Sequence, residues 1–254
     1  MNLPVKLYPP KPEKVYLYGT CLVNSFAPES GLDAIALLEQ QGVEVIYPGE
    51  QTCCGQPAYN SGYSAQALAV AKNQMALFPE PWPIVILSGS CGGMMRKHYQ
   101  ELAPEDQTML DFTRRIFEFS EFLLHCLNIK LEDRGEKERV TLHTSCSGRR
   151  EMSIHDTSVA LLQQLQNVEL VDHAYSTECC GFGGTFSVKQ ADISSVMASD
   201  KANHLTATQS ARYVSTDWGC MLNINCTLEH QQNPLRGLHL ASYLYQRTRV
   251  QDEV

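Results

Sequence analysis

The sequence repeats one arrangement of cysteines, and this internal repeat constrains the fold more than any other feature. The segment KVYLYGTCLVN at 14–24 aligns with RVTLHTSCSGR at 139–149. Two further blocks recur in the same order and at nearly the same separation: TCCGQ aligns with ECCGF, and VILSGSCGGMM with YVSTDWGCMLN. Chance is a poor explanation for three matching blocks in one order. We therefore expect an internal duplication and two halves with the same fold.

Each half alternates strand-length apolar runs with segments of helical spacing. In the first half the predicted strands are 14–20, 43–48 and 83–89, and the predicted helices are 29–42 and 63–78. In the second half the strands are 139–144, 168–172 and 211–216, and the helices are 158–166 and 190–205. Such alternation is typical of parallel sheets covered by helices. The sequence thus predicts an α/β fold of two duplicated Rossmann-like lobes, each a parallel sheet flanked by helices, related by internal pseudo-symmetry.

A strongly charged segment, IKLEDRGEKER at 129–139, lies between the two halves and contains Gly135. Its composition is typical of a connection rather than of a packed element. We expect a first cysteine-rich lobe at 14–128, a charged linker at 129–139 and a second cysteine-rich lobe at 140–250.

Eight cysteines lie at or shortly after the ends of predicted strands. Functional groups of parallel α/β sheets collect at the carboxyl ends of the strands, so each half gathers four thiols at one edge. The predicted cofactor-binding and metal-binding residues are Cys21, Cys53, Cys54 and Cys91 in the first half, and Cys146, Cys179, Cys180 and Cys220 in the second. In a reducing compartment clustered cysteines mark metal ligation or redox chemistry more often than disulfides.

Both halves place a glycine directly after two adjacent cysteines. Neighbouring side chains of an extended chain point to opposite faces, so two adjacent sulfurs reach one centre only if the backbone turns between them. Gly55 and Gly181 suit this turn because glycine readily adopts positive φ. A strained disulfide between the adjacent cysteines is the competing interpretation, and it leaves Cys21 and Cys91 unexplained.

Thiolates bind both zinc and iron–sulfur clusters. Structural zinc sites usually present their cysteines as CxxC pairs, and this sequence has none. Iron–sulfur clusters accept cysteines from widely separated loops, so we expect iron–sulfur chemistry, with zinc as the alternative. The stretch GFGGTF is not a dinucleotide fingerprint, because Phe186 stands where the last glycine is needed.

Three segments carry a family resemblance: EQTCCGQPAYNSGY, SGSCGGMMRKHY and ECCGFGGTFSVK. They resemble the cysteine-rich CCG-domain iron–sulfur oxidoreductases, which include the CCG-containing subunit of heterodisulfide reductase, the glycolate oxidase iron–sulfur subunit and, most similar here, the lactate utilization protein A family. The resemblance extends over nearly the whole chain. It implies an iron–sulfur redox subunit with [4Fe–4S] cluster(s), active in a complex that oxidises L-lactate to pyruvate, with an iron–sulfur partner and a third small subunit.

One departure from this pattern concerns the last cysteine of each block. Heterodisulfide reductase ends its blocks in CxxC and gives five cysteines to one cluster. Met94 and Asn223 occupy the corresponding positions here. Four thiols per half remain, the number that a conventional four-cysteine cluster requires, and the number of clusters stays open.

Other residues near the cysteine blocks have less specific interpretations. Basic residues expected at helix starts would offset the charge of an anionic cluster, or would be solvated surface charges: Arg96, Lys97, Arg149 and Arg150. Three histidines would either ligate metal or donate to sulfur, or simply lie in the core or on the surface: His98, His143 and His173. His98 is a weak candidate for a base, and the catalytic residues are unknown. We expect Cys126 to be a buried structural thiol and consider Cys226 as an auxiliary ligand.

Composition excludes some functions. The net charge of −8 argues against a nucleic-acid partner. The first residues have no apolar core of a signal peptide, and no apolar run is long enough to cross a bilayer, so we expect a cytoplasmic protein. Since no flavin or nicotinamide motif is visible, we favour electron relay within a complex. The alternative is a metal-stabilised or thiol-sensing interaction protein without turnover of its own.

Overall fold

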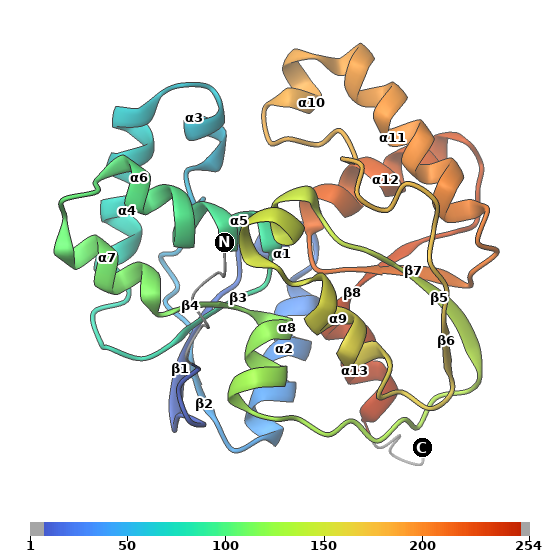
Figure 1. The fold of residues 1–254 in the computed structure, drawn as a ribbon, viewed down its shortest axis with the longest axis horizontal. Helices are drawn as coiled ribbons and strands as arrows, with labels where there is room; N and C mark the ends of the chain where they lie inside the picture. Colours follow the sequence, from blue (N-terminus) through green and yellow to red (C-terminus); the bar gives the residue numbers. More distant parts are fainter. Residues whose placement is uncertain (1–7, 250–254) are drawn as a thin grey trace, which may run out of the picture.

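The computed structural model describes residues 8–249 and contains two four-stranded sheets (Figure 1). The strands of the first sheet are β1 (Lys14–Tyr18), β2 (Glu44–Ile46), β3 (Ile84–Ile86) and β4 (Ile116–Glu118). Those of the second are β5 (Glu138–His143), β6 (Val168–Leu170), β7 (Arg212–Ser215) and β8 (Gly237–His239). The orders are β2-β1-β3-β4 and β6-β5-β7-β8, and every pairing is parallel. This confirms the predicted α/β fold with two duplicated lobes.

Helices connect the strands and cover the sheets. In the first half they are α1 (Cys21–Phe26), α2 (Pro28–Gln40), α3 (Gln56–Asn60), α4 (Ser64–Ala76), α5 (Gly89–Gly93), η1 (Met94–His98), α6 (Tyr99–Leu102), α7 (Gln107–Arg114), α8 (Phe119–Glu121) and η2 (Phe122–Cys126). In the second they are η3 (Gly148–Met152), α9 (His155–Leu162), α10 (Phe186–Lys189), α11 (Ala191–Thr206), α12 (Trp218–His230) and α13 (Leu240–Thr248). The three η elements are π-helical. Within residues 8–249 we find no helix with the length and apolar character needed to cross a membrane.

Each sheet has a fourth strand that the sequence analysis misses. Strand β4 is three residues long and continues at once into the apolar helical segment α8–η2, so its sequence resembles a helix. Strand β8 is equally short and contributes Gly237, Leu238 and His239, which form no apolar run. The predicted strands are present, and all except β5 are shorter than expected, because the chain turns into a helix or loop as soon as the sheet ends.

The two lobes pack against each other in a corresponding way. Helix α2 packs on α13 of the other half, and α8 and η2 pack on α9. At the carboxyl edge of the sheets, α5 packs on η3 and α1 on α12. One apolar core includes buried residues from both halves, among them Leu37, Leu123, Leu162 and Leu244. The interface between the lobes is therefore part of the hydrophobic core.

The lobes approach closely where α5 meets η3. A Cβ atom on Gly89 would lie 2.8 Å from the Gly148 Cα and 2.9 Å from the Ile154 Cδ1, so only glycine fits there. A buried hydrogen bond also crosses the interface. His239 accepts from the Ala241 amide through Nδ1, which leaves its Nε2 to donate to the Leu87 carbonyl at 3.2 Å.

The segment predicted as a linker is held in place by α13. Residues 129–137 have no regular secondary structure, and Arg247 of α13 pairs with Asp133 at 2.6 Å. The same guanidinium donates to the Glu136 carbonyl at 2.7 Å. The strands of the two sheets come from separate halves, but the division into lobes at 14–128 and 140–250 remains a prediction.

Replacing Gly89 by alanine tests the closeness of the lobes. The added methyl group would overlap the Gly148 backbone, so we expect Gly89→Ala to lower the free energy of unfolding by about 1–3 kcal/mol. Gly31→Ala is the matched control: Gly31 lies in α2, and a Cβ there would meet only Val23 at 3.7 Å. This control should raise stability by about 0.5–1 kcal/mol. Equal denaturant midpoints for the two variants would contradict the close packing.

Candidate metal centres

The four predicted thiols of the first lobe line one cavity. Cys21 begins α1 after β1, Cys53 and Cys54 lie in the loop after β2, and Cys91 lies in α5 after β3. The cavity measures about 310 Å³. Cys54 and Cys91 are buried, whereas Cys21 and Cys53 are partly exposed at its surface.

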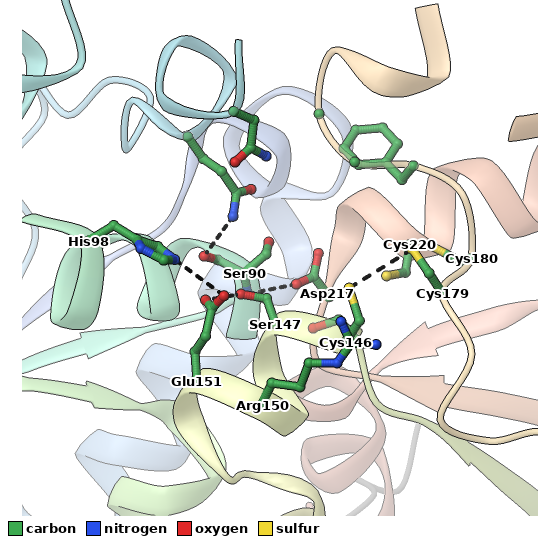
Figure 2. Close-up of a pocket in the computed structure, with 16 residues that line it drawn as sticks. Ser90, His98, Cys146, Ser147, Arg150, Glu151, Cys179, Cys180, Asp217 and Cys220 are labelled. Atoms are coloured by element: carbon green, nitrogen blue, oxygen red, sulfur yellow. Dashed lines mark hydrogen bonds and ion pairs between the residues drawn. The ribbon is translucent and has the colours of Figure 1, made fainter. Parts of the chain in front are cut away.

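The four thiols of the second lobe line an adjacent cavity of about 170 Å³ (Figure 2). Cys146 follows β5, Cys179 and Cys180 lie in the loop between β6 and α10, and Cys220 lies in α12 after β7. The Sγ atoms of Cys146 and Cys179 are 3.9 Å apart. Sγ atoms of Cys180 and Cys220 and a ring nitrogen of His143 lie within 4.8 Å of one another. None of the described cysteines in either cavity is joined in a disulfide.

The turn predicted after each cysteine pair is present. Gly55 has φ +85° and Gly181 has φ +84°, a backbone conformation that glycine adopts without strain. In the second lobe the Gly181 amide donates to the Cys179 Sγ at 3.4 Å. The positive φ of both glycines is thus confirmed, and the turn directs adjacent sulfurs to one cavity.

Side chains from neighbouring elements fix the carbonyl groups of these turns. In the first lobe the Tyr18 hydroxyl donates to the Thr52 carbonyl at 2.6 Å and the Tyr99 hydroxyl to the Cys54 carbonyl at 2.9 Å. In the second lobe the Asn223 side-chain amide donates to the Cys180 carbonyl at 2.8 Å. Asn223, which stands where heterodisulfide reductase has a cysteine, therefore positions the backbone of a predicted ligand.

Hydrogen bonds between the thiols shift their pKa values. The bond from the Cys146 thiol, more than any other contact, lowers the pKa of Cys179 to about 2. Cys53 has its pKa lowered to about 3 by the corresponding bond in the first lobe. The hydrogen bond to Cys179, with burial, raises the pKa of Cys180. Cys53 and Cys179 thus favour the thiolate form, and a metal ion would displace protons from the other thiols that it binds.

Residues of both lobes form the wall between the cavities. Four of them line both cavities: Gln56, Ser90, Phe182 and Gly184. The buried carboxylate of Asp217 accepts from the Ser90 amide at 2.8 Å and from the Gly219 amide at 3.2 Å. Since Ser90 precedes Cys91 and Gly219 precedes Cys220, one carboxylate ties together the helices that carry two predicted ligands.

Known proteins share this pattern. A family profile described as a cysteine-rich domain, CCG, matches residues 15–96 and 140–225. The chain belongs to this CCG family. It is 36% identical to lactate utilization protein A 2 of Bacillus cereus (strain Q1), over 91% of this chain and 97% of that protein. It is 35% identical to lactate utilization protein A of Halalkalibacterium halodurans, over 94% of this chain and 100% of that protein. The resemblance inferred from the cysteine blocks is confirmed.

A solved structure shares the fold. A hypothetical protein from Helicobacter pylori superposes with a TM-score of 0.70 at 11% identity, over 96% of this chain and 51% of that one. At this identity the likeness concerns the architecture alone. Membership of the CCG family and the clustering of the cysteines together suggest metal or iron–sulfur binding.

Two basic residues of this CCG protein do not lie where the sequence analysis places them. The helix after β3 begins at Gly89, with Ser88 as its N-cap, so Arg96 and Lys97 fall in η1 and not in a first helical turn. Arg96 forms an ion pair with Glu121, and Lys97 is exposed. The expectation that these residues begin a helix is wrong, because the helix after β3 already begins at Gly89, two residues before Cys91.

The other candidate side chains differ in their relation to the cavities. Arg150 lines the second-lobe cavity, whereas Arg149 contacts the His155 Nδ1 at 3.1 Å. His98 also lines that cavity, and both of its ring nitrogens are close to carboxylates: Nδ1 is 2.7 Å from Glu101 and Nε2 is 3.2 Å from Glu151. We therefore assign no base to this site.

His173 and the two remaining cysteines line neither of the two cavities. His173 is buried and contacts the Ala174 carbonyl through Nδ1 at 3.0 Å. Cys126 is buried in η2, as expected for a structural thiol. Cys226 is exposed on α12 and lines a separate surface cavity, a placement that gives no support to an auxiliary ligand.

Sequence reasoning missed two buried charged residues near the thiols. Asp217 aligns with Ser88, and both cap the helix that carries the following cysteine, so the repeat contained a signal for its capping role. The hydrogen bond that Asp217 accepts from Ser90 of the first lobe could not be predicted from the repeat. Lys201 of α11 is buried, and its Nζ donates to the Tyr175 carbonyl at 2.7 Å.

Gly181→Val tests the turn between the adjacent cysteines. A Cβ at this position would lie 2.8 Å from the Ser194 carbonyl oxygen, and valine resists positive φ. We expect this variant to lose the metal of the second lobe and about 1–3 kcal/mol of stability. Metal analysis after anaerobic loading and denaturant unfolding measure the two effects.

The matched control for this variant is Gly49→Val. A Cβ on Gly49 would meet no atom within 4 Å, and Gly49 has no positive φ, so the metal content and stability of this control should equal those of the wild type. Gly55→Val, also at positive φ, should affect the first lobe in the same way as Gly181→Val affects the second. Full metal content in both CCG variants would contradict the role of the turn.

Proposed function

We propose that this chain is the iron–sulfur redox subunit of a complex that oxidises L-lactate to pyruvate, and that it relays electrons through [4Fe–4S] clusters. One observation carries the proposal: two sets of four thiols lie at the carboxyl edges of two sheets and line adjacent cavities with a common wall. The choice of L-lactate as the substrate rests on the relatives, which are named lactate utilization protein A.

The residues fit one cluster in each lobe. Each set comes from three separate segments of chain, an arrangement that iron–sulfur clusters accept and that differs from the CxxC pairs of structural zinc sites. The first set is Cys21, Cys53, Cys54 and Cys91, and the second is Cys146, Cys179, Cys180 and Cys220. A bound cluster would supply one-electron transfer.

The protein would keep these centres close together and partly shielded from water. Two thiols of each set are buried: Cys54 and Cys91 in the first lobe, and Cys180 and Cys220 in the second. The Gln56 side-chain amide donates to the Ser90 carbonyl at 3.2 Å, and Asp217 binds the Ser90 amide. These bonds hold the common wall in place, so the separation of the two thiol sets is fixed by the fold.

The organic step belongs to a partner. Oxidation of lactate to pyruvate releases two electrons and two protons, and an organic cofactor such as a flavin usually carries out such a step. This chain has no flavin or nicotinamide motif. We therefore place lactate oxidation in the complex, with another iron–sulfur subunit and a third small subunit as partners, and electron relay in this chain.

Reduction by L-lactate tests this function. In an anaerobic mixture of the loaded chain and its two partner subunits, L-lactate should bleach the visible iron–sulfur absorbance of this chain. The chain alone should respond to dithionite but not to lactate. Loss of both clusters of this chain, by Cys91→Ser with Cys220→Ser, should abolish the part of the bleaching that this chain contributes beyond that of its iron–sulfur partner.

Two outcomes would contradict the proposal. If dithionite bleaches the iron–sulfur absorbance but L-lactate does not bleach it in the mixture, the proposed role in lactate oxidation is wrong. A loaded chain whose metal never changes oxidation state would favour the metal-stabilised or thiol-sensing interaction protein.

Single cysteine variants test whether each lobe holds its own centre. We expect Cys91→Ser to remove the iron of the first lobe and to leave the second loaded, because each lobe has a complete set of four thiols. Cys220→Ser should do the reverse. Cys126→Ser and Cys226→Ser are controls and should keep the iron content of the wild type. Loss of all iron from either ligand variant would instead indicate one cluster shared between the lobes.

A further inference from the structure

The duplicated lobes differ at one buried position beside the thiols. Tyr18 ends β1 and His143 ends β5, each three residues before the first cysteine of its lobe. The Tyr18 hydroxyl is hydrogen-bonded to the Thr52 carbonyl at 2.6 Å. His143 is 1% exposed, and no described group satisfies its Nδ1 or its Nε2. Two unpartnered nitrogens on one buried ring are unusual, because buried polar groups are normally hydrogen-bonded.

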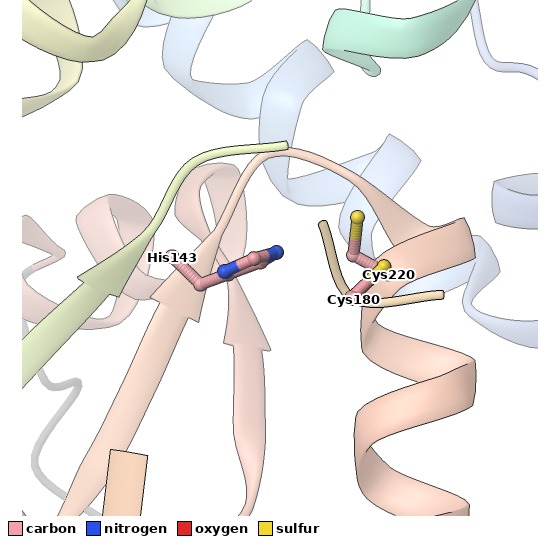
Figure 3. A group of neighbouring side chains, drawn as sticks. All are labelled: His143, Cys180 and Cys220. Carbon is pink, nitrogen blue, oxygen red and sulfur yellow. The ribbon is translucent and has the colours of Figure 1, made fainter. Parts of the chain in front are cut away.

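The ring of His143 lies beside two predicted ligands. One of its nitrogens and the Sγ atoms of Cys180 and Cys220 lie within 4.8 Å of one another. Figure 3 shows the ring at the end of its strand, with one nitrogen edge toward these two cysteines. A group bound between the sulfurs would therefore also reach the imidazole.

The neighbouring polar groups do not bond to the His143 ring, and His173 has an unpartnered Nε2 of its own. The Nζ of Lys201 donates to the Tyr175 carbonyl at 2.7 Å, and His173 contacts the Ala174 carbonyl through Nδ1 at 3.0 Å. The rings of His143 and His173 have their centroids 6.2 Å apart. Neutral imidazole is a common metal ligand, so a metal held by Cys180 and Cys220 would take up a lone pair of His143.

We propose that His143 is a nitrogen donor to the metal centre of the second lobe. This inference rests on the proposed iron–sulfur function and adds to it that the two centres differ. In the second lobe the imidazole would be available as a donor beside the four thiols, whereas the first lobe would offer only cysteine donors, since the equivalent Tyr18 is hydrogen-bonded to the Thr52 carbonyl. Histidine as a ligand changes cluster charge and potential, so the duplicated lobes hold centres with different electronic properties.

The test is pulsed electron paramagnetic resonance of the reduced, iron-loaded full chain. The spectrum should show the strong hyperfine coupling of a directly bound imidazole nitrogen. In protein labelled with ¹⁵N-histidine this coupling should appear at the frequencies of ¹⁵N instead of those of ¹⁴N. This measurement on the wild type requires no substitution. His143→Ala and the more conservative His143→Gln should lose the coupling, with the sheet content checked by circular dichroism. Tyr18→Phe, the equivalent change in the first lobe, should keep it.

Each outcome decides the matter. Absence of histidine coupling in the labelled wild type, or its persistence in both His143 variants, overturns the inference while the iron–sulfur function stands. If the protein holds zinc, the proposed function fails, and X-ray absorption at the zinc edge then tests the donor: a nitrogen ligand lost in His143→Ala supports it. If the anaerobically loaded protein binds neither metal, both the function and the inference fail.

Discussion

The close contact between α5 and η3 is the constraint on which the candidate site depends. Because Gly89 and Gly148 have no side chains, the two backbones approach to a distance that a single methyl group would prevent. The helices that follow β3 and β5 lie next to cysteines of different lobes. Their contact therefore brings two thiol sets, each formed by its own sheet, to opposite sides of one wall. The buried Asp217 carboxylate fixes the same arrangement with a hydrogen bond from the Ser90 amide.

Duplication accounts for the architecture, and the two copies differ at residues beside the thiols. Ser88 and Asp217 both cap the helix that carries a cysteine, but only the carboxylate also reaches the other lobe. Tyr18 is hydrogen-bonded to a turn carbonyl, while the equivalent His143 faces the thiols. The proposed relay would therefore use two centres that lie close together in non-identical surroundings.

The repeat and the glycine turns could be predicted from the sequence, because both depend on local pattern. Cysteine spacing predicted two equivalent sheet edges, and the adjacent cysteines required positive φ at Gly55 and Gly181. Strand β4 was missed because it runs directly into an apolar helical segment, and β8 was missed because Gly237 and His239 leave it without an apolar run. The position of Arg96 depends on a π-helical segment, and the cross-lobe bond of Asp217 depends on how the lobes dock, so neither follows from spacing alone.

The central claim is that each set of four thiols holds its own iron–sulfur centre. The most direct measurement is the iron and acid-labile sulfide content of anaerobically prepared wild-type protein, with zinc determined on the same sample. The account predicts about eight iron and about eight sulfide per chain, from one [4Fe–4S] cluster in each lobe, without stoichiometric zinc. Stoichiometric zinc without sulfide would contradict it, because the thiols would then hold a structural metal and relay no electrons.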